Sequence, residues 1–186
     1  AGESSKDIEI CVELWRFLTE NEADRKAVLI NLGGGVISDI GGFVASTYKR
    51  GIDYINVPTT LLAMVDASIG GKNGIDLDQL KNQIGTITTP KLLYINTDFL
   101  HTLPENELRS GLAEMIKHGL IADKNHWNSF LDISQLNYET LDQLIRESIS
   151  IKNQIVITDP KEKGIRKTLN FGHTIGHAIE SYFLSQ

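Results

Sequence analysis

A strand-length apolar segment that runs into three glycines and then into a helix places the strongest limit on how this chain can fold. Residues 27–32 form a strand-length run that is apolar except for Asn31 and ends at Gly33-Gly34-Gly35, and residues 36–48 have helical periodicity. In a doubly wound α/β fold, this succession presents backbone N–H groups and a helix N-terminus to a phosphate group. The triplet lacks the G-x-G-x-x-G spacing, so a plain tight turn explains the glycines equally well.

A second strand and helix follow, with threonines at their junction. Residues 53–57 read as a strand that stops at Pro58-Thr59-Thr60, before an apolar helical segment at 61–65. Threonines at the carboxyl end of a strand can cap the next helix or hydrogen-bond a cofactor, and capping alone is the simpler interpretation. Residues 91–95 read as one more strand, and Asn96-Thr97-Asp98 ends the α/β part.

A polar segment between these strands is poorly suited to a core. Residues 65–74 place small residues around Asp66 and Lys72, and a second lysine, Lys81, follows with Asn82. Lysine ammonium groups can pair with phosphate or carboxylate groups. The segment therefore indicates either an anion-binding site or a solvated loop.

The second half of the chain has helical patterns only. Leu103-Pro104-Glu105 opens a helix with proline in the first turn, residues 107–121 and 141–157 form long helical segments, and residues 159–166 are turn-like. We therefore expect two domains, an α/β domain at 1–98 and an all-helical domain at 99–186. Both ends of the chain look cut, so we expect a fragment.

Two histidines near the end of the chain are candidate metal or substrate ligands. His173 and His177 are spaced i and i+4, which places them on one helix face, and Gly172 and Gly176 keep the neighbouring surface bare. An isolated pair is more often one core and one surface histidine, because two ligands do not complete a zinc site. The helical half contains further polar candidates: Glu114, Lys117, Lys152, Arg166 and Asn170. Each of them alone also fits a surface ion pair or a solvated helix end. Together with a phosphate-binding sheet layer, they indicate a metal and an anionic substrate held between the two domains.

Composition narrows the class of protein. The 186 residues carry a net charge of −6, which argues against a nucleic-acid backbone as the main partner. The single cysteine, Cys11, allows no internal disulfide and lies in the apolar stripe of an amphipathic helix, so it reads as a packing residue. We find no signal peptide and no apolar run long enough to span a bilayer, and we expect a cytoplasmic protein without a membrane partner.

Longer motifs follow one another in a fixed order along essentially the whole chain. The first half contains Gly2-Glu3-x-x-Lys6, Gly33-Gly34-Gly35-Val36-x-x-Asp39, Arg50-Gly51, Pro58-Thr59-Thr60-Leu61-Leu62, Val65-Asp66-x-Ser68-x-Gly70-Gly71-Lys72 and Lys81-Asn82. The second half contains Ala113-Glu114-x-x-Lys117, Gly164-x-Arg166 and Leu169-Asn170-Phe171-Gly172-His173-Thr174-x-Gly176-His177-Ala178-x-Glu180. In these motifs the chain closely resembles the 3-dehydroquinate synthase family.

The resemblance implies a fold, cofactors and a reaction. The family has a Rossmann-like NAD-binding α/β domain followed by a helical metal- and substrate-binding domain, with NAD and zinc (Zn2+, or Co2+) in the cleft, and it works as a homodimer. Its substrate is a sugar phosphate, 3-deoxy-D-arabino-heptulosonate 7-phosphate, which becomes 3-dehydroquinate and phosphate in the shikimate pathway of aromatic amino acid biosynthesis. The reaction combines transient oxidation by NAD, β-elimination of phosphate, re-reduction and intramolecular aldol closure.

The resemblance also assigns residues. Glu114 and His173 match two zinc ligands, His177 matches a proton relay, and Arg50 matches an arginine that reaches the substrate phosphate of the neighbouring subunit. The cofactor positions are matched by Glu3, Lys6, Gly34, Gly35, Val36, Asp39, Thr59, Thr60, Lys72, Lys81, Phe99 and Thr102. The substrate-contacting positions are matched by Asp66, Lys72, Asn82, Lys117, Lys152, Arg166, Asn170 and His177.

Some features depart from the family pattern. The family usually has other residues at four positions beside the matched ones, where this chain has Ser38, Asn73, Leu80 and Ile87. We expect altered loop packing there, with the chemistry kept. The resemblance places the first strands of the NAD-binding domain before Ala1 and a third zinc ligand beyond Gln186, so we expect the 186 residues alone to be inactive.

Three other functions stay open. The nearest is another sugar phosphate cyclase, which would close sedoheptulose 7-phosphate or glucose 6-phosphate and would differ at substrate positions such as Lys152 and Asn170. A metal-dependent polyol dehydrogenase of the same fold has less use for so many anion-binding lysines. A non-catalytic NAD-binding or regulatory module would bind NAD without metal uptake or turnover.

Overall fold

The computed structural model describes residues 2–78, 80–132, 137–176 and 179. They belong to two compact units, Ala1–Leu112 and Ala113–Gln186. The division between the units lies within helix α3 (Glu105–Ala122), C-terminal to the domain boundary that the sequence predicts at Asp98. The start of α3 packs closely on the first unit, because a Cβ atom added at Gly111 would lie 2.4 Å from Leu61 Cγ.

The first unit is an α/β structure. Its elements in chain order are η1 (Glu3–Ser5), α1 (Ile8–Glu20), β1 (Val28–Gly33), α2 (Gly35–Thr47), η2 (Tyr48–Arg50), β2 (Asp53–Pro58), the π-helical turn η3 (Ala63–Ala67), β3 (Lys72–Leu77), β4 (Leu80–Ile87), β5 (Leu92–Leu93), η4 (Thr97–Thr102) and the first part of α3. This confirms the α/β class of the first half, and β5 is shorter than the predicted strand at 91–95.

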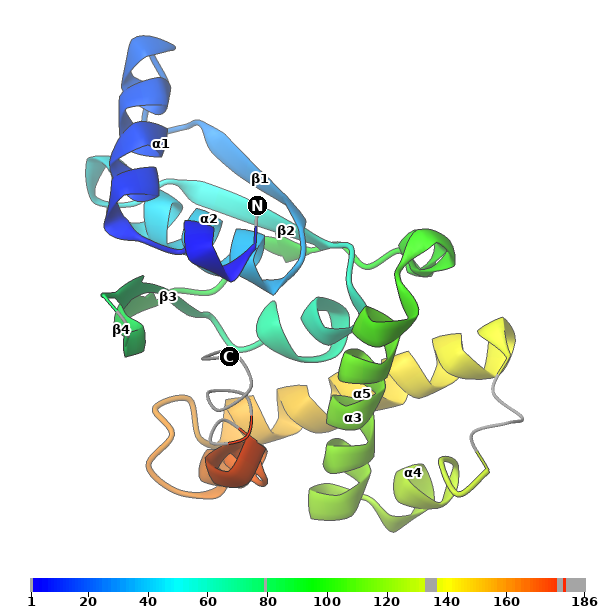
Figure 1. Cartoon of the computed structure of the whole chain (residues 1–186). Coiled ribbons are helices and arrows are strands. Elements are labelled where there is room, and N and C mark those ends of the chain that lie inside the picture. The colour runs from blue at the N-terminus through cyan, green and yellow to red at the C-terminus, as the bar shows by residue number, and fades with distance from the viewer. Residues whose placement is uncertain (1, 79, 133–136, 177–178, 180–186) are drawn as a thin grey trace. The chain divides into compact units, whose positions relative to one another are not determined.

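The strands β1, β2 and β5 form a parallel sheet in that order. The register pairs Gly33 of β1 with Pro58 of β2, and Thr59 N donates to Gly33 O at 2.9 Å. The loops that follow β1 and β2 therefore begin side by side, at the carboxyl edge of the sheet, as Figure 1 shows. This edge is where doubly wound folds bind their ligands.

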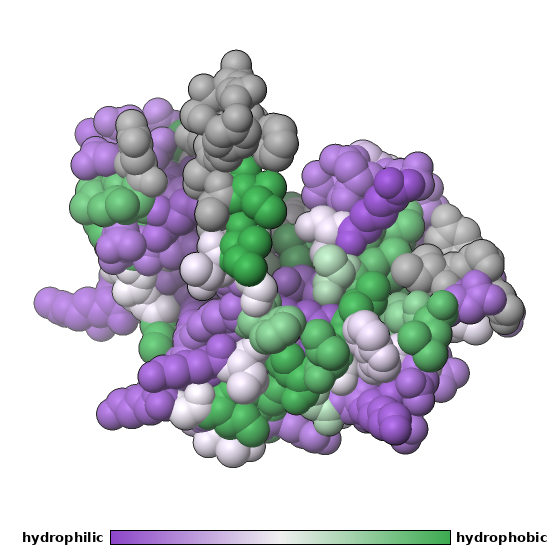
Figure 2. Space-filling model, turned by 60° about the horizontal axis from the view of Figure 1, so that its bottom comes forward, coloured by the Kyte–Doolittle hydropathy of each residue, from purple (hydrophilic) through white to green (hydrophobic). Residues whose placement is uncertain are grey.

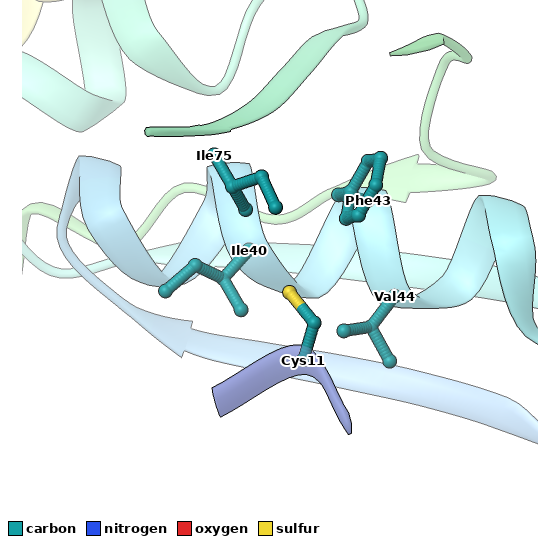
Figure 3. Close-up of a cluster of buried hydrophobic side chains, with 5 residues drawn as sticks. All are labelled: Cys11, Ile40, Phe43, Val44 and Ile75. Carbon is teal, nitrogen blue, oxygen red and sulfur yellow. The ribbon is translucent and has the colours of Figure 1, made fainter. Parts of the chain in front are cut away.

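Helix α2 organises the core of the first unit. Five buried side chains from α1, α2 and β3 form one cluster, shown in Figure 3: Cys11, Ile40, Phe43, Val44 and Ile75. Cys11 is fully buried in this cluster, which confirms that it is a packing residue, and burial, then the charge of Asp7, raises the pKa of its thiol to about 11.

Two adjacent glycines let α2 approach its neighbours closely. A Cβ atom at Gly41 would lie 1.9 Å from Asn31 Oδ1, and a Cβ atom at Gly42 would lie 2.0 Å from Asn73 Oδ1. Both asparagines are buried, Asn31 in β1 and Asn73 in β3. Side chains larger than hydrogen at these two helix positions would therefore displace buried amides.

The strands β3 and β4 form an antiparallel hairpin that the sequence did not predict. Lys72 pairs with Ile87 and Leu77 pairs with Leu80, and Asp78 in the turn has a φ of +54°. The polar segment at 65–74 is thus only partly a loop, because its last residues, from Lys72 onward, form a strand.

The second unit is helical in the part that the structure describes. It contains the rest of α3, α4 (Lys124–Asn128), α5 (Tyr138–Thr158), the 3₁₀ turn η6 (Ile165–Asn170) and a helical turn at 173–176. Helix α5 runs across α3 in Figure 1, and the His118 Nδ1 atom of α3 lies 2.7 Å from Ser148 Oγ of α5. The predicted helical second half is therefore confirmed.

Charged and polar side chains cover much of the face shown in Figure 2, with apolar areas between them. Among the described residues, no helix combines the length and the apolar character that crossing a membrane requires.

Candidate functional site

The first candidate site lies where β1 ends and α2 begins. The N-cap residue of α2, Gly34, provides no side-chain hydrogen bond to the helix, so protein side chains leave the first-turn N–H groups uncapped. A Cβ atom at Gly34 would lie 3.1 Å from Thr60 Cγ2, and one at Gly35 would lie 3.1 Å from Ala67 Cβ. The glycines thus keep a narrow gap beside an uncapped helix N-terminus, which suits an anionic group. The predicted strand–glycine–helix succession is confirmed.

The two threonines after β2 lie at the same edge. Thr60 Oγ1 accepts a hydrogen bond from Ala63 N at 3.2 Å, so it caps the turn that follows, as the simpler interpretation predicted. Thr59 is half-buried, and its backbone N–H is bonded to Gly33. Both side chains lie at the predicted cofactor edge, whereas a cofactor contact by either stays a prediction.

A buried ion pair lies beside the first turns of α2. Lys6 is 4% exposed, and its Nζ atom lies 2.7 Å from Asp39 Oδ2 and 3.9 Å from Glu3 Oε1. Burial raises the pKa of the Asp39 carboxyl above its ordinary value, although the ammonium group of Lys6 acts in the opposite direction. The structure therefore brings together three of the predicted cofactor residues, from η1, the segment after it and α2.

The hairpin separates two lysines that the sequence placed in one polar site. Lys72 begins β3 opposite Ile87, whereas Lys81 lies next to the turn, at the other end of the hairpin. Because Leu80 pairs with Leu77, Lys81 lies about four residues further along the hairpin than Lys72, and four residues of a strand span roughly 13 Å. Asn82, beside Lys81, has a φ of +54° and donates its backbone N–H to Asp76 Oδ1 at 2.7 Å. The two lysine residues therefore lie at opposite ends of one hairpin.

The remaining predicted residues of the first unit are spread over several elements. Asp66 is half-buried in η3, and Phe99 and Thr102 lie in η4. Arg50 is exposed and has a φ of +69° at the end of η2, just before Gly51. Val36 lies in the first turn of α2, next to the glycines.

The second unit contains the candidate metal ligands. Glu114 of α3 and His173 of the turn at 173–176 approach each other, with 3.9 Å between Glu114 Oε1 and His173 Nε2. The other carboxylate oxygen of Glu114 forms an ion pair with Lys117, one turn further along α3. A carboxylate and an imidazole are both zinc ligands. His177, the second member of the predicted histidine pair, lies outside the described residues.

One buried histidine near Glu114 was not among the residues predicted from the sequence. His118 is buried, and its ligand atoms lie within 4.8 Å of those of Glu114. The two residues are spaced i and i+4 on α3, the same spacing that singled out His173 and His177. The spacing was therefore a signal that could have found His118.

Three cations are buried in the second unit. Lys117 is 7%, Lys152 5% and Arg166 3% exposed. The alternative that Lys152 and Arg166 are solvated helix ends is therefore wrong. The second unit thus holds three of the predicted substrate residues as buried cations, and lysine and arginine cations pair with phosphate and carboxylate groups.

The loop before η6 holds Arg166 in place. The Asp159 carboxylate accepts backbone N–H hydrogen bonds from Lys163 at 2.9 Å, Gly164 at 2.6 Å and Arg166 at 3.2 Å. The Arg166 Nη1 atom donates to Pro160 O at 2.9 Å. Further along, the exposed Asn170 donates its Nδ2–H to Glu162 Oε1 at 2.7 Å. Of these two predicted substrate residues, Arg166 is therefore buried and Asn170 is exposed.

Two family profiles together match the whole chain. The sequence profile of the 3-dehydroquinate synthase N-terminal region matches residues 1–110, and that of the C-terminal region matches residues 111–186. A 3-dehydroquinate synthase of Parabacteroides distasonis is 50% identical over 97% of this chain and 52% of its own length. The chain thus spans about half the length of the curated relatives it matches.

Solved structures give the same fold. A 2-deoxy-scyllo-inosose synthase, complexed with carbaglucose-6-phosphate, NAD+ and Co2+, matches 98% of this chain and 52% of its own, with a TM-score of 0.89 and 30% identity. A 2-epi-5-epi-valiolone synthase from Streptomyces hygroscopicus, with NAD+ and Zn2+ bound, matches 93% of this chain and 50% of its own, with a TM-score of 0.82 and 32% identity. Because both family profiles match and together cover every residue, the chain belongs to the 3-dehydroquinate synthase family.

Proposed function

We propose that the protein containing this chain converts 3-deoxy-D-arabino-heptulosonate 7-phosphate to 3-dehydroquinate and phosphate, as a lyase that uses NAD and zinc. The observation that carries the proposal is the pair of Glu114 and His173, 3.9 Å apart, in a unit that also buries three cations. The pair suits a metal, and the cations suit a substrate with a carboxylate and a phosphate. The 50% identity to a 3-dehydroquinate synthase supports the same reaction.

The residues at the carboxyl edge of the sheet fit NAD. The gap at Gly34 and Gly35, which a Cβ atom would fill, lies beside the uncapped N-terminus of α2 and would admit the cofactor's pyrophosphate. Glu3, Lys6 and Asp39 lie together and would contact the ribose and the adjoining groups. The other proposed contacts, which rest on the resemblance, are Val36, Thr59, Thr60, Lys72, Lys81, Phe99 and Thr102.

The residues of the second unit fit a metal such as zinc. Zinc binds carboxylate oxygen and imidazole nitrogen at about 2.0–2.2 Å, so two of its ligand atoms lie at most about 4.3 Å apart. The 3.9 Å between Glu114 Oε1 and His173 Nε2 is within that limit. Lys117, paired with the second oxygen of Glu114, would orient the carboxylate in the way that outer partners orient metal ligands. We propose these two residues as ligands, with a third ligand elsewhere in the protein.

Zinc and NAD would supply one part of the chemistry, and the residues of the chain the other. When bound, zinc would make a substrate hydroxyl more acidic, and NAD would take up and return a hydride at the carbon that carries it. The chain's own residues bind and orient the substrate, and orientation can account for much of the rate in a reaction that needs few proton donors. His177 is proposed to move the proton of the C5 hydroxyl, and the leaving phosphate itself is proposed to take the proton released in the elimination.

Charged side chains would hold the two ends of the substrate. Lys72, Lys152 and, from a neighbouring subunit, Arg50 are proposed to bind its anionic groups, because an ammonium or guanidinium group pairs with phosphate and carboxylate. Asp66, Asn82, Lys117, Arg166 and Asn170 are proposed as further substrate contacts. The role of Arg50 requires a homodimer, which we propose together with a cytoplasmic location, on the pattern of the family.

A second candidate function is the closure of a different sugar phosphate. The 2-deoxy-scyllo-inosose synthase favours it, because its TM-score is 0.89. Its sequence identity is only 30%, against 50% for the Parabacteroides distasonis synthase. The closer sequence relationship supports 3-dehydroquinate synthase as the main proposal.

Phosphate release by the complete gene product tests the proposal. We expect 3-deoxy-D-arabino-heptulosonate 7-phosphate to release phosphate when NAD and zinc are present, with no net accumulation of NADH, because the hydride returns to the substrate. Absence of phosphate release would contradict the proposal. Net NADH accumulation would instead support a polyol dehydrogenase.

A further inference from the structure

A buried amide side chain lies next to the proposed substrate residue Lys72. Asn73 is 7% exposed, and its Nδ2 atom, which carries two hydrogens, lies within hydrogen-bonding distance of three acceptors: Gly71 O at 3.1 Å, Thr88 O at 2.9 Å and the Tyr54 hydroxyl at 3.2 Å. The Tyr54 hydroxyl, which is also buried, donates in turn to Thr88 O. One amide group thus joins three segments: strand β2, the bend before β3 and the segment after β4.

The bend that Asn73 holds determines where Lys72 lies. Gly70 and Gly71 have φ values of +99° and +67°, a backbone conformation that glycine adopts readily and other residues rarely do. A Cβ atom at Gly71 would lie 3.0 Å from the carbonyl carbon of Thr88, and Gly71 O also accepts from Thr88 N at 2.8 Å. Two flexible glycines are therefore kept in one conformation by hydrogen bonds, and the Asn73 amide bonds both to Gly71 in the bend and to Thr88 in the segment that faces it.

The surroundings leave Asn73 little freedom to move. Gly42 of α2 is so close that a Cβ atom there would lie 2.0 Å from Asn73 Oδ1. Tyr54, 1% exposed, belongs to β2, the central strand of the parallel sheet. The amide therefore ties the start of β3 to the sheet whose carboxyl edge is the proposed cofactor site, while the Lys72 side chain itself is exposed.

We infer that Asn73 is a positioning residue, which acts through Lys72 by holding the Gly70–Gly71 bend. This inference rests on the proposed function, in which Lys72 binds an anionic end of the substrate. An isolated buried hydrogen bond would add only to stability. A hydrogen bond that sets the backbone one residue from a substrate-binding ammonium group also sets the position of that group, and small displacements of such groups are costly for catalysis.

The chain offers a matched control for a purely structural role. Asn31 and Asn56 form another buried amide pair in the same unit, with 2.8 Å between Asn31 Nδ2 and Asn56 Oδ1. Asn31 lies against Gly41 as Asn73 lies against Gly42. This pair joins β1 to β2, and neither of its members adjoins a proposed substrate residue. Asn56→Ala should therefore destabilise the protein without changing the KM for the sugar phosphate.

A double-mutant cycle in the complete gene product tests the inference. The variants are Asn73→Ala, Lys72→Gln and the two combined, and the measurements are kcat, the KM for 3-deoxy-D-arabino-heptulosonate 7-phosphate and the urea midpoint of unfolding. We expect Asn73→Ala to raise the KM about tenfold and Lys72→Gln to raise it at least as much. The double variant should have the KM of Lys72→Gln alone, because Asn73 acts through Lys72. Asn73→Thr should recover part of the loss, since a hydroxyl group can donate to one of the two carbonyl groups.

The outcomes separate the inference from the proposed function. If the effects of Asn73→Ala and Lys72→Gln on KM add in the double variant, or if Asn73→Ala lowers stability but leaves KM unchanged as Asn56→Ala does, the positioning role is wrong. If Lys72→Gln leaves KM unchanged, the substrate role of Lys72 in the proposed function is wrong, and the inference falls with it. Should Asn73→Ala fail to fold, the same cycle with Asn73→Thr decides the question through the same two comparisons.

Discussion

Lys6 and Asp39 form a buried ion pair at the proposed cofactor edge, and their coupling can be measured. Lys6→Met leaves the Asp39 carboxylate without its cation in a mostly buried position, so we expect a loss of about 2 kcal/mol in the free energy of unfolding, below the value for a fully buried pair. Urea unfolding at neutral pH measures it. The pair of Lys91 and Asp53 is a matched control, because both its members are more than half exposed.

For the control, Lys91→Met should cost less than about 1 kcal/mol. Adding Asp39→Asn to Lys6→Met should restore part of the lost stability, because the uncompensated buried charge is then removed. Equal losses for Lys6→Met and Lys91→Met would show that the buried pair contributes no more than a surface one.

The Glu114 and His173 pair predicts how the protein binds metal. Glu114→Gln and His173→Ala each remove one proposed ligand, so zinc should bind at least about 100-fold more weakly to either variant, which isothermal titration of the complete gene product can measure. Glu107→Gln changes an exposed glutamate of the same helix and is the control. Unchanged zinc affinity in both ligand variants would exclude these residues as ligands.

Asp159 predicts a pH-dependent loop around Arg166. The N–H hydrogen bonds from Lys163 and Gly164, and then the bond and charge of Arg166, hold the pKa of the Asp159 carboxyl below its ordinary value. A carboxyl whose pKa is lower in the folded state contributes stability above its ordinary pKa of about 3.9, and that contribution is lost as the pH falls through the lowered value.

Amide hydrogen exchange of Gly164 and Arg166 should therefore stay slow at neutral pH and lose its protection, relative to the rest of the unit, only below about pH 4. Asp159→Asn keeps an acceptor oxygen but loses the charge, so the protection should already be lower at neutral pH and should not fall further in acid. Asp98→Asn, at an exposed position, is the control. The same acid profile in Asp159→Asn as in the unmodified protein would contradict this account.

At the scale of elements, helix α2 depends on its two glycines. Alanine at position 42 would gain helix propensity of about 1 kcal/mol, but its Cβ would lie 2.0 Å from Asn73 Oδ1. We expect Gly42→Ala to destabilise the protein by about 1–3 kcal/mol in urea unfolding, because the core is overpacked. In the Asn73→Ala background the same change should cost nothing or stabilise the helix. If Gly42→Ala destabilises the Asn73→Ala protein as much as it destabilises the unmodified protein, the added methyl group clashes with a residue other than Asn73.

The elements also show what the sequence could predict. The strands β1 and β2 and the helices α2, α3 and α5 follow from local apolar patterns, which are properties of single segments. The β3–β4 hairpin does not, because Asn73 and Lys72 read as a polar loop from sequence. Asn73 is buried only because Tyr54 and Thr88, distant along the chain, supply hydrogen bonds to it.

The candidate site was predictable to a similar extent. The resemblance identified Glu114 and His173, and the structure places them 3.9 Å apart. The resemblance could not show that Lys72 and Lys81 lie at opposite ends of a hairpin, because their separation depends on the register of the two strands. Nor could it single out Asp159, whose three backbone N–H partners come together only when the loop folds.

For the whole molecule, the relation between this chain and its relatives carries a prediction. The chain spans 52% of the Parabacteroides distasonis synthase, and two ligands alone bind zinc weakly. We expect the isolated 186-residue chain to release no phosphate from 3-deoxy-D-arabino-heptulosonate 7-phosphate under conditions in which the complete gene product does. Turnover by the isolated chain would show that these residues suffice for the reaction.

The choice of substrate distinguishes the proposed reaction from those of the related cyclases. We would measure kcat/KM of the complete gene product, with NAD and zinc, for 3-deoxy-D-arabino-heptulosonate 7-phosphate, sedoheptulose 7-phosphate and glucose 6-phosphate side by side. We predict a preference of at least about 100-fold for the first, because the other two lack the carboxylate, and Lys152, the buried member of the three cations proposed to bind its anionic groups, would lose a partner. A preference for either of the other sugar phosphates would contradict it.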